Sequence, residues 1–297
     1  MNLVPLTKQL YRLDGENKGR FPRAHAFYVK DEICALIDSG CGIKVLEAFK
    51  KKRNRVDLVI NSHCHPDHGA GNWLFPDHPI WVPDDGTNSH GRINPLAHRL
   101  VEPGALAETW KAFVREAMGF QNSRPTHHYR DGYVFDFGRL KLTAISTPGH
   151  TLDHFCLFDS YHGLLLSFDI DLTAYGPWYG NRESDLAGFR SSLQKIRALK
   201  LRNIASSHRE VIGIDSLPEE LDRYEAVFER RNNKILGLLT EKPGRMDELL
   251  AASPFYGGHT YAADLLGYWE GQMIRKHLEE LIGQGLVWEE GDRFGLV

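Results

Sequence analysis

The segment at residues 61–69 reads Asn-Ser-His-Cys-His-Pro-Asp-His-Gly and concentrates four metal-binding side chains within six positions. It follows the apolar, β-branched run at residues 56–60, so we expect it to lie at the end of a buried strand. His63 and His65 are two positions apart, which places them on one side of an extended backbone. Imidazole and carboxylate groups suit zinc, manganese or iron. The segment therefore predicts a metal site rather than a histidine-rich surface loop.

The bulk composition narrows the class of protein. The 297 residues suffice for one large domain and a small one. The net charge of −3 gives no broad basic surface for nucleic acid. The N-terminus lacks the apolar core of a signal peptide, and no apolar run approaches the roughly 18 residues of a membrane span. Four cysteines without paired spacing favour reduced thiols. We therefore expect a cytoplasmic protein that does not span a membrane.

The hydrophobic pattern of residues 1–215 alternates short strands with helices, which predicts an α/β fold. The expected strands are 9–13, 26–30, 33–37, 56–60, 80–82, 133–137, 140–146, 155–158, 164–168 and 203–206. The expected helices are 45–52 and 185–199. Residues 83–130 differ in character, because loops rich in Gly, Asn and His surround two helical stretches at 95–101 and 105–118. We interpret this part as an insertion that forms a lid.

The last third of the chain predicts a second, smaller unit. A helical linker at 216–242 precedes two helices at 247–252 and 271–283 and a hairpin from 286–288 and 294–297. This order is typical of a winged-helix module, which we place at residues 243–297. The second helix carries both basic and acidic side chains, whereas a DNA-reading helix is usually basic. The pattern favours packing or homodimer formation and leaves nucleic acid as a less favoured partner.

The pattern H-x-H-x-D-H at residues 63–68 resembles the signature of the metallo-β-lactamase fold superfamily. Three later segments are similar to the other ligand-bearing segments of that family, in the family's order. They are Thr-Pro-Gly-His-Thr at 147–151, the strand 164–168 followed by Asp169, and Ser-Ser-His at 206–208. The resemblance covers about residues 1–215 and implies a four-layer αβ/βα sandwich. The C-terminal region resembles the winged-helix-like region of the β-lactamase-2-like group.

The resemblance also implies a ligand set for two divalent ions, with zinc favoured and iron or manganese as alternatives. One ion would be held by His63, His65 and His150, the other by Asp67, His68 and His208, with Asp169 bridging them. Two such ions share a water, lower its pKa toward about 7 for zinc, and polarise the bond to be cleaved. A metal-bridging hydroxide would then attack the substrate, and Asp67 could orient it by accepting its proton.

One position departs from the family pattern, and other residues near the expected ligands allow more than one role. Phe168 stands where the family usually has a glycine, and Asp171 is an alternative to Asp169 as the bridging ligand. His154 lies four residues beyond His150, where the family often has a supporting histidine. We expect Cys64 to face away from the two histidines beside it and to serve as buried filler.

Residues after Asp169 suggest a substrate site. Tyr175 resembles, in placement, the tyrosine that polarises the carbonyl in acyl-homoserine lactonases, although its spacing is longer, and ordinary loop packing is an equal alternative. In the insertion, four side chains could close over a substrate, although packing is the favoured role. These are Phe113, Phe120, His127 and His128.

Three hypotheses of function follow. The first is a hydrolase of a small ester, thioester or lactone. The second is a phosphodiesterase or ribonuclease, and the third is a non-catalytic, metal-binding regulatory protein. His65 favours hydrolysis, because flavodiiron oxidoreductases of the family typically have a glutamate there. Glyoxalase II is a poor fit, since the C-terminal region offers no clear counterpart of its basic glutathione-binding residues.

Overall fold

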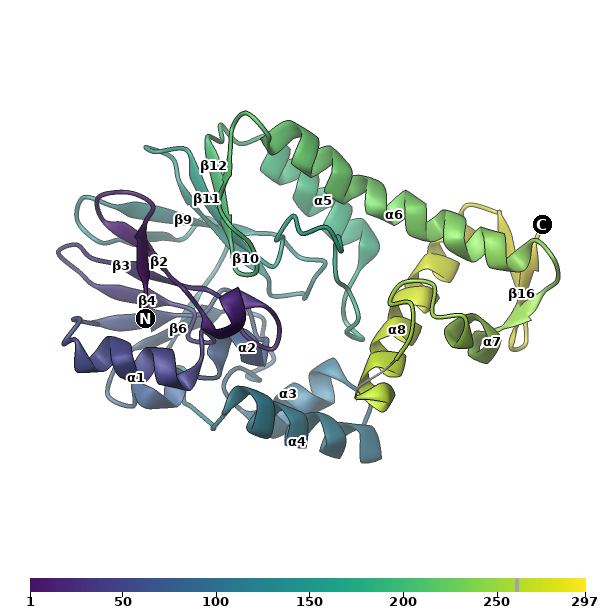
Figure 1. Ribbon diagram of the computed structural model, residues 1–297, viewed down its shortest axis with the longest axis horizontal. Coiled ribbons are helices and arrows are strands. Elements are labelled where there is room, and N and C mark those ends of the chain that lie inside the picture. The colour runs from purple at the N-terminus through teal and green to yellow at the C-terminus, as the bar shows by residue number, and fades with distance from the viewer. Residues whose placement is uncertain (260–261) are drawn as a thin grey trace.

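Two β-sheets lie face to face in the first 215 residues of the computed structural model, which describes residues 1–259 and 262–297 (Figure 1). The first sheet contains β1 to β7 in sequence order. Its strands are β1 (Leu3–Pro5), β2 (Leu10–Leu13), β3 (Ala26–Val29), β4 (Ala35–Ile37), β5 (Leu58–Ile60), β6 (Ile80–Pro83) and β7 (His127–Tyr129). The second sheet has the order β13-β12-β11-β10-β9-β8. Its strands are β8 (Val134–Asp136), β9 (Lys141–Ser146), β10 (Phe155–Asp159), β11 (Leu164–Phe168), β12 (Asn203–Ser206) and β13 (Ile212–Gly213).

Alternating side chains fill the space on both faces of each sheet. In β3, Phe27 packs between the sheets, whereas Tyr28 faces α1 (Ile43–Lys51) on the outside. In β11, Leu166 packs between the sheets and Leu165 faces the outer helices α5 (Leu186–Arg197) and α6 (Leu217–Leu239). The order of layers is helix, sheet, sheet, helix (Figure 1), which confirms the predicted α/β sandwich.

The direction of the strands gathers several loops at one edge of the sandwich. Strands β4, β5 and β6 run parallel, so the loops that follow them leave from the same edge of the first sheet. Strands β11 and β12 are also parallel, and β9 shares their direction because both β9 and β11 pair antiparallel with β10. Residues 61–69, 147–151, 169 and 207–208 therefore emerge at neighbouring strand ends.

The connection from β6 to β7 contains two helices, α3 (Ile93–Leu100) and α4 (Ala105–Met118). Trp110 and Val114 of α4 pack with Trp269 in one apolar cluster. Strand β7 lies inside the predicted insertion, and its presence in the first sheet corrects our expectation of loops there. The reason is that His127 and His128 are exposed and leave only Tyr129 buried, so the strand is specified by pairing with β6 and not by local hydrophobicity.

The C-terminal elements are β14 (Gly244–Arg245), α7 (Met246–Ala251), α8 (Ala263–Gly283), β15 (Val287–Glu290) and β16 (Arg293–Leu296). They confirm the predicted order of helix, helix and hairpin, and the strands form a sheet β14-β16-β15. Helix α8 begins eight residues before the predicted start at Gly271. Gly267 weakens the local helix signal, but Leu265 and Trp269 are buried against the α3–α4 pair, which stabilises the additional turns.

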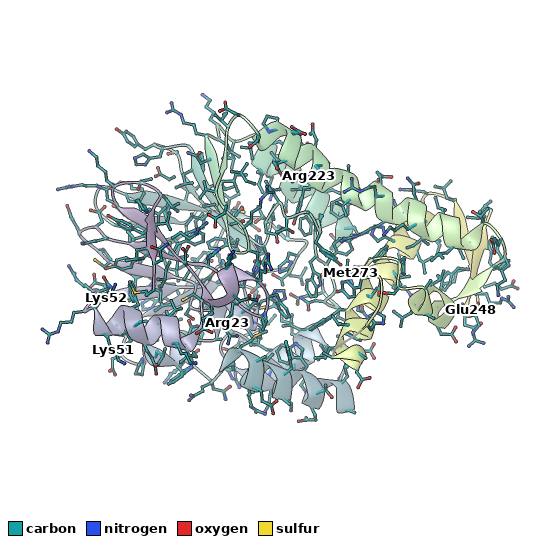
Figure 2. All side chains as sticks on the ribbon, in the orientation of Figure 1. Arg23, Lys51, Lys52, Arg223, Glu248 and Met273 are labelled. Carbon is teal, nitrogen blue, oxygen red and sulfur yellow. The ribbon has the colours of Figure 1, made fainter. Side chains whose placement is uncertain are left out.

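Figure 2 shows how side chains divide between the interior and the surface. Met273 of α8 is fully buried beneath α6, whereas Lys51, Lys52 and Glu248 extend from exposed helix ends. Within the described residues, no helix combines the length and the apolar character that crossing a membrane requires.

Candidate metal centre

The structure brings together all seven side chains for which the sequence suggested metal binding. Four atoms from one set lie within 4.8 Å of one another, and three atoms from a second set do the same. The first set contains His63, His65, His150 and Asp169, and the second contains Asp67, His68 and His208. The residues come from the loops after β5, β9, β11 and β12, and from the single turn α2 (Pro66–Gly69).

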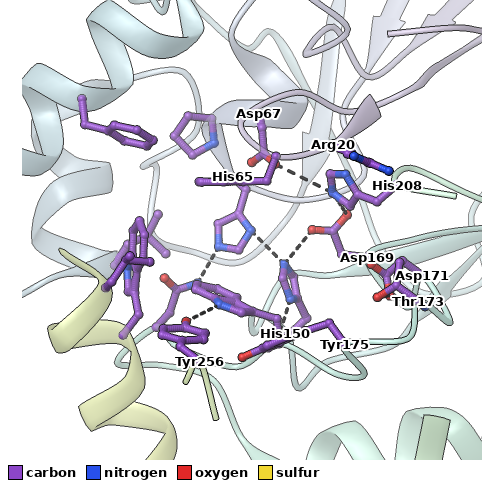
Figure 3. A pocket seen from close by; sticks show the side chains of 18 of the residues that line it. Arg20, His65, Asp67, His150, Asp169, Asp171, Thr173, Tyr175, His208 and Tyr256 are labelled. Atoms are coloured by element: carbon purple, nitrogen blue, oxygen red, sulfur yellow. Dashed lines mark hydrogen bonds and ion pairs between the residues drawn. The ribbon is translucent and has the colours of Figure 1, made fainter. Parts of the chain in front are cut away.

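Asp169 belongs to the first set but also reaches the second, because one of its oxygens faces each set. Its Oδ1 is 2.9 Å from His68 Nε2 and 3.3 Å from His208 Nε2. Its Oδ2 is 3.0 Å from His150 Nε2 (Figure 3) and 3.7 Å from His63 Nε2. This is the arrangement expected of a carboxylate that bridges two cations.

Asp171, the alternative to Asp169, is occupied elsewhere. Its Oδ1 accepts hydrogen bonds from the backbone N–H of Thr173 at 3.1 Å and from the Thr173 hydroxyl at 3.2 Å. It belongs to neither set of close donor atoms, although it lines the same cavity. The geometry therefore favours Asp169 over Asp171 as the residue between the two sets.

Phe168 occupies the position before Asp169 where the family usually has a glycine. Its φ of 48° lies in the left-handed region, which costs a non-glycine residue on the order of 1 kcal/mol. The ring is fully buried and packs edge-on against Phe27, with centroids 5.7 Å apart. Burial of a phenylalanine contributes about 1.5–3 kcal/mol, which offsets the backbone strain and explains how this departure is tolerated.

Two of the histidines are oriented by side chains near the first sheet. His68 Nδ1 donates to Asp38 Oδ2 at 2.7 Å, and His63 Nδ1 donates to the Ser62 hydroxyl at 3.0 Å. The Ser62 hydroxyl in turn donates to Asp38 at 2.8 Å. Because the Nδ1 atoms are used in this way, the Nε2 atoms of both rings face the two sets.

Two more histidines are oriented by backbone carbonyl groups. His150 Nδ1 donates to the carbonyl of Trp178 at 2.9 Å, and His208 Nδ1 donates to the carbonyl of Gly19 at 2.6 Å. Gly149 allows the close approach of this loop to α5, because a Cβ there would lie 2.3 Å from the backbone of Phe189. Distant parts of the chain therefore fix the free Nε2 atoms of both rings.

His65 is arranged differently from the other histidines. Its Nδ1 faces the first set and lies 2.8 Å from His150 Nε2, while its Nε2 contacts the side-chain amide of Asn181. In the structure the amide nitrogen of Asn181 donates to Nε2; rotation of the amide by 180° presents its oxygen instead, so that Nε2–H donates and Nδ1 is free to bind a cation.

The unsatisfied polar atoms show that the residues fit a metal group. His63 Nε2, His68 Nε2 and Asp169 Oδ1 are buried, and although the last two lie 2.9 Å apart, none of the three makes a well-directed hydrogen bond to a described residue. Burial lowers the pKa of His63 well below its usual value and so favours the neutral ring that binds metals. Burial alone would raise the pKa of Asp169, but the neighbouring histidines, His68 foremost, together outweigh it and lower that pKa well below its usual range.

Two residues near the sets lie outside both. His154 Nε2 accepts the backbone N–H of Asp169 at 3.3 Å, and its Nδ1 donates to the carbonyl of Thr147 at 3.1 Å, so the ring supports the Asp169 loop. Cys64 is buried in the apolar cluster of α3 and α4. Burial raises the pKa of this thiol well above its usual value, which keeps it protonated.

A cavity of about 680 Å³ opens beside the two sets. Its polar half contains Arg20, Asp171, Asn181 and five of the seven candidate ligands, which are His65, Asp67, His150, Asp169 and His208. Its other half is apolar and is formed by α3, α4, α8 and Phe21. Figure 3 shows the labelled histidines and aspartates on one side of this space and α8 on the other.

The aromatic residues suggested for substrate contact have different positions. Tyr175 and Phe113 line the cavity, but Phe120 is buried in the α3–α4 cluster. His127 stacks on Trp81 with centroids 4.5 Å apart, and His128 is exposed on β7, so neither lines the cavity. The hydroxyl of Tyr175 lies 3.7 Å from Met273 Sδ, and its ring lies 4.7 Å from the Arg231 guanidinium.

Sequence reasoning missed several residues that shape the site. Asp38 follows β4, the parallel neighbour of β5, so its place at a strand end was a signal that it lies near His63. Asn181 and Phe21 carry no comparable local signal, since irregular segments bring them to the cavity.

The sequence model of the Metallo-beta-lactamase superfamily matches residues 20–208. A "Beta-lactamase-like protein 2 homolog" from Caenorhabditis elegans is 33% identical over 115 residues, which are 39% of this chain and 37% of that protein. "Acyl-coenzyme A thioesterase MBLAC2" from Homo sapiens is 24% identical over 162 residues, which are 50% of this chain and 58% of that protein. The chain thus spans less than two thirds of the length of these curated relatives.

A solved structure extends the likeness in fold to the C-terminal elements. A metallo-beta-lactamase family protein from Thermus thermophilus superposes with a TM-score of 0.77 and 21% identity, over 99% of this chain and 100% of that one. The sequence match at residues 20–208 covers more than half of the chain and includes all seven residues of the two sets. On these grounds the chain belongs to the metallo-beta-lactamase superfamily.

Proposed function

We propose that the chain is a metal-dependent hydrolase of a small ester, thioester or lactone. Two divalent ions, with zinc favoured over iron and manganese, would be held by the two sets of side chains. The first ion would be held by His63, His65 and His150 and the second by Asp67, His68 and His208, and Asp169 would contribute to both. The observation that carries this proposal is the position of Asp169, whose two oxygens face different sets.

The chemistry follows from what the ions supply and from what the chain holds in place. Bound divalent ions provide hydroxide near neutral pH and polarise a carbonyl oxygen. Asp67 lines the cavity, and its Oδ2 is 4.0 Å from His68 Nε2 and 3.9 Å from His208 Nε2. Burial raises the pKa of Asp67, which makes its carboxylate a better proton acceptor. Asp67 would therefore accept a proton as the carbonyl carbon is attacked.

Tyr175 would donate a hydrogen bond to the substrate carbonyl oxygen. Its hydroxyl contacts the thioether of Met273, which is a weak acceptor that a substrate oxygen can replace. Burial raises the pKa of Tyr175 well above its usual value, so the hydroxyl stays protonated and able to donate.

The charge of the cavity favours a carbonyl substrate over a nucleic acid. Arg20 is the one Lys or Arg among the described residues that line it, whereas Asp67, Asp169 and Asp171 are acidic. A polynucleotide needs several cations along its backbone, which this lining does not offer. The human relative named acyl-coenzyme A thioesterase supports a thioester or ester. A regulatory protein that only binds metal would have no need of a cavity at the ligands.

A substrate panel combined with metal analysis tests the proposal. We expect close to two equivalents of transition metal and hydrolysis of p-nitrophenyl esters, thioesters or lactones by the full chain. A chelator should remove both metal and activity, and added zinc should restore them. Cleavage of bis-p-nitrophenyl phosphate without cleavage of any carbonyl substrate would overturn the substrate class. Metal-free protein that cannot be reconstituted would overturn the whole proposal.

A further inference from the structure

The apolar half of the cavity is built from three separate parts of the chain. Its lining side chains are Phe21, Leu100, Trp110, Phe113, Val114, Met118, Leu266 and Trp269. They come from the loop before β3, from α3 and α4, and from α8. None of them is charged, so this set of eight, which we call the acyl arm, offers a surface that favours an apolar ligand.

Aromatic contacts join the three parts into one wall. Phe21 stacks on Phe113 with centroids 5.9 Å apart and meets Trp269 edge-on at 6.2 Å. Trp269 in turn meets Trp178 at 5.8 Å. Although Phe21 is 47% exposed, these contacts hold it across α4 and α8.

The acyl arm is continuous with the metal-facing residues. Trp178 lies 5.8 Å from the ring of His65 and 5.6 Å from the ring of His150. It is fixed in this place because its indole N–H donates to the Tyr256 hydroxyl at 2.9 Å. A molecule with its carbonyl group at Asp169 can therefore extend along Trp178 into the arm, whose eight lining side chains are uncharged.

We propose that the acyl arm binds a saturated aliphatic acyl chain and selects substrates by its length. The inference rests on the proposed hydrolase function, since the chain belongs to the substrate whose carbonyl is attacked. Water contributes the new C–O bond, the C–O or C–S bond to the leaving group breaks, and the leaving group receives a proton. The product released from the arm is a fatty acid.

The proposal predicts how the rate depends on chain length. Each methylene that enters the arm gains about 0.8 kcal/mol by leaving water, equivalent to about a fourfold increase in kcat/KM. The increase should end when the arm is full, because further methylenes remain in solvent. The experiment measures kcat/KM of the full chain on p-nitrophenyl esters from acetate to palmitate.

Variants that fill the arm sharpen this experiment. Val114→Phe on α4 and Leu266→Trp on α8 enlarge lining side chains on two different helices. Each should lower the ratio of kcat/KM for decanoate ester to that for acetate ester at least tenfold and move the optimum to shorter chains. Leu266 is only half buried, so its variant remains informative if Val114→Phe does not fold. Ala112→Phe, at an exposed position of α4, is the matched control and should leave the ratio unchanged.

A binding measurement separates this inference from the proposed function. Calorimetry should show that the wild-type chain binds decanoate at least tenfold more tightly than butyrate, and that Val114→Phe or Leu266→Trp reduces this difference. Selective binding of decanoate by protein that hydrolyses no ester, thioester or lactone would support the acyl arm and contradict the proposed hydrolase function. If the rate of ester hydrolysis does not depend on chain length, and decanoate and butyrate bind equally, the acyl-chain proposal is wrong and the hydrolase proposal stands.

Discussion

The two halves of the cavity are built in different ways. The polar half consists of loops at strand ends, in which hydrogen bonds fix nearly every ring, such as that of His68 to Asp38. The apolar half consists mainly of the α3–α4 pair and α8, which begins more than 140 residues after α4 ends, held by contacts such as that of α4 with Trp269 on α8. Side chains of the polar half are therefore held in place by hydrogen bonds, and those of the apolar half by packing. Substitutions in the helices should change selectivity without removing the metal.

A buried charged network joins the two halves. Arg99 of α3 pairs with Asp153 at 2.9 Å, with Glu183 at 2.6 Å, and with Asp85. His90 pairs with Asp153 at 2.8 Å and Asp85 at 3.4 Å. Asp153 and Glu183 belong to the loops that carry His150 and Asn181 respectively. The network therefore connects the insertion to the backbone that positions the candidate ligands.

The largest effect is expected in the polar half, from Asp169→Ala. Removing the carboxylate between the two sets leaves His68, His208 and His150 without their shared partner. We expect loss of metal and a fall in kcat/KM greater than the roughly 10–100-fold that loss of a residue behind a ligand costs. Metal analysis and ester hydrolysis measure both effects.

Asp171→Asn is the matched control, since Asp171 lines the same cavity two residues away and belongs to neither set. It should retain the metal content of the wild type. If Asp171→Asn loses metal and Asp169→Ala does not, the assignment of the bridging residue must be exchanged.

Tyr175→Phe tests whether Tyr175, which lines the cavity, donates a hydrogen bond to the substrate through its hydroxyl. Loss of a hydrogen bond to the carbonyl oxygen should lower kcat by roughly 100-fold. Metal content should not change, because the Tyr175 hydroxyl contacts Met273 and no member of the two sets. Equal turnover in Tyr175→Phe and wild type would assign this ring to packing on Arg231 instead.

The contrast between the halves also explains what the sequence could predict. The histidine segment follows the apolar strand β5, and both signals are local, so its position could be derived from a few neighbouring residues. Strand β7 and the first turns of α8 depend on partners far away in the sequence, namely β6 and the α3–α4 pair. The contacts of Phe21 and Arg99 could not be predicted either, because no neighbouring residue in the sequence specifies them. The apolar half was therefore the harder half to predict.

The network that joins the halves should make folding stability depend on pH. Burial lowers the pKa of His90, but its bonds to Asp153 and Asp85 outweigh this and raise the pKa to about 8, from 6.5. A raised pKa means that the stabilisation is fully present below pH 6.5 and is lost as the pH rises through 8. The shift is equivalent to about 2 kcal/mol in the free energy of unfolding. Urea unfolding at pH 6 and pH 9 measures the difference.

His90→Gln should remove this part of the pH dependence, and the exposed His128→Gln should preserve it. Identical pH profiles in wild type and His90→Gln would show that the network does not hold His90 in its charged form.

The smallest effect is expected in the apolar half, from Phe21→Ala. The ring makes two aromatic contacts, each of which is worth about 0.5–1.5 kcal/mol, and half of its surface already meets solvent. We expect KM for a decanoate ester to rise roughly threefold to tenfold, with kcat and metal content unchanged, because Phe21 would contact the chain equally in the ground state and the transition state. Steady-state kinetics with acetate and decanoate esters distinguish the outcomes. A fall in kcat with both esters would mean that Phe21 also positions His208 through the neighbouring Gly19, and that the two halves are not independent.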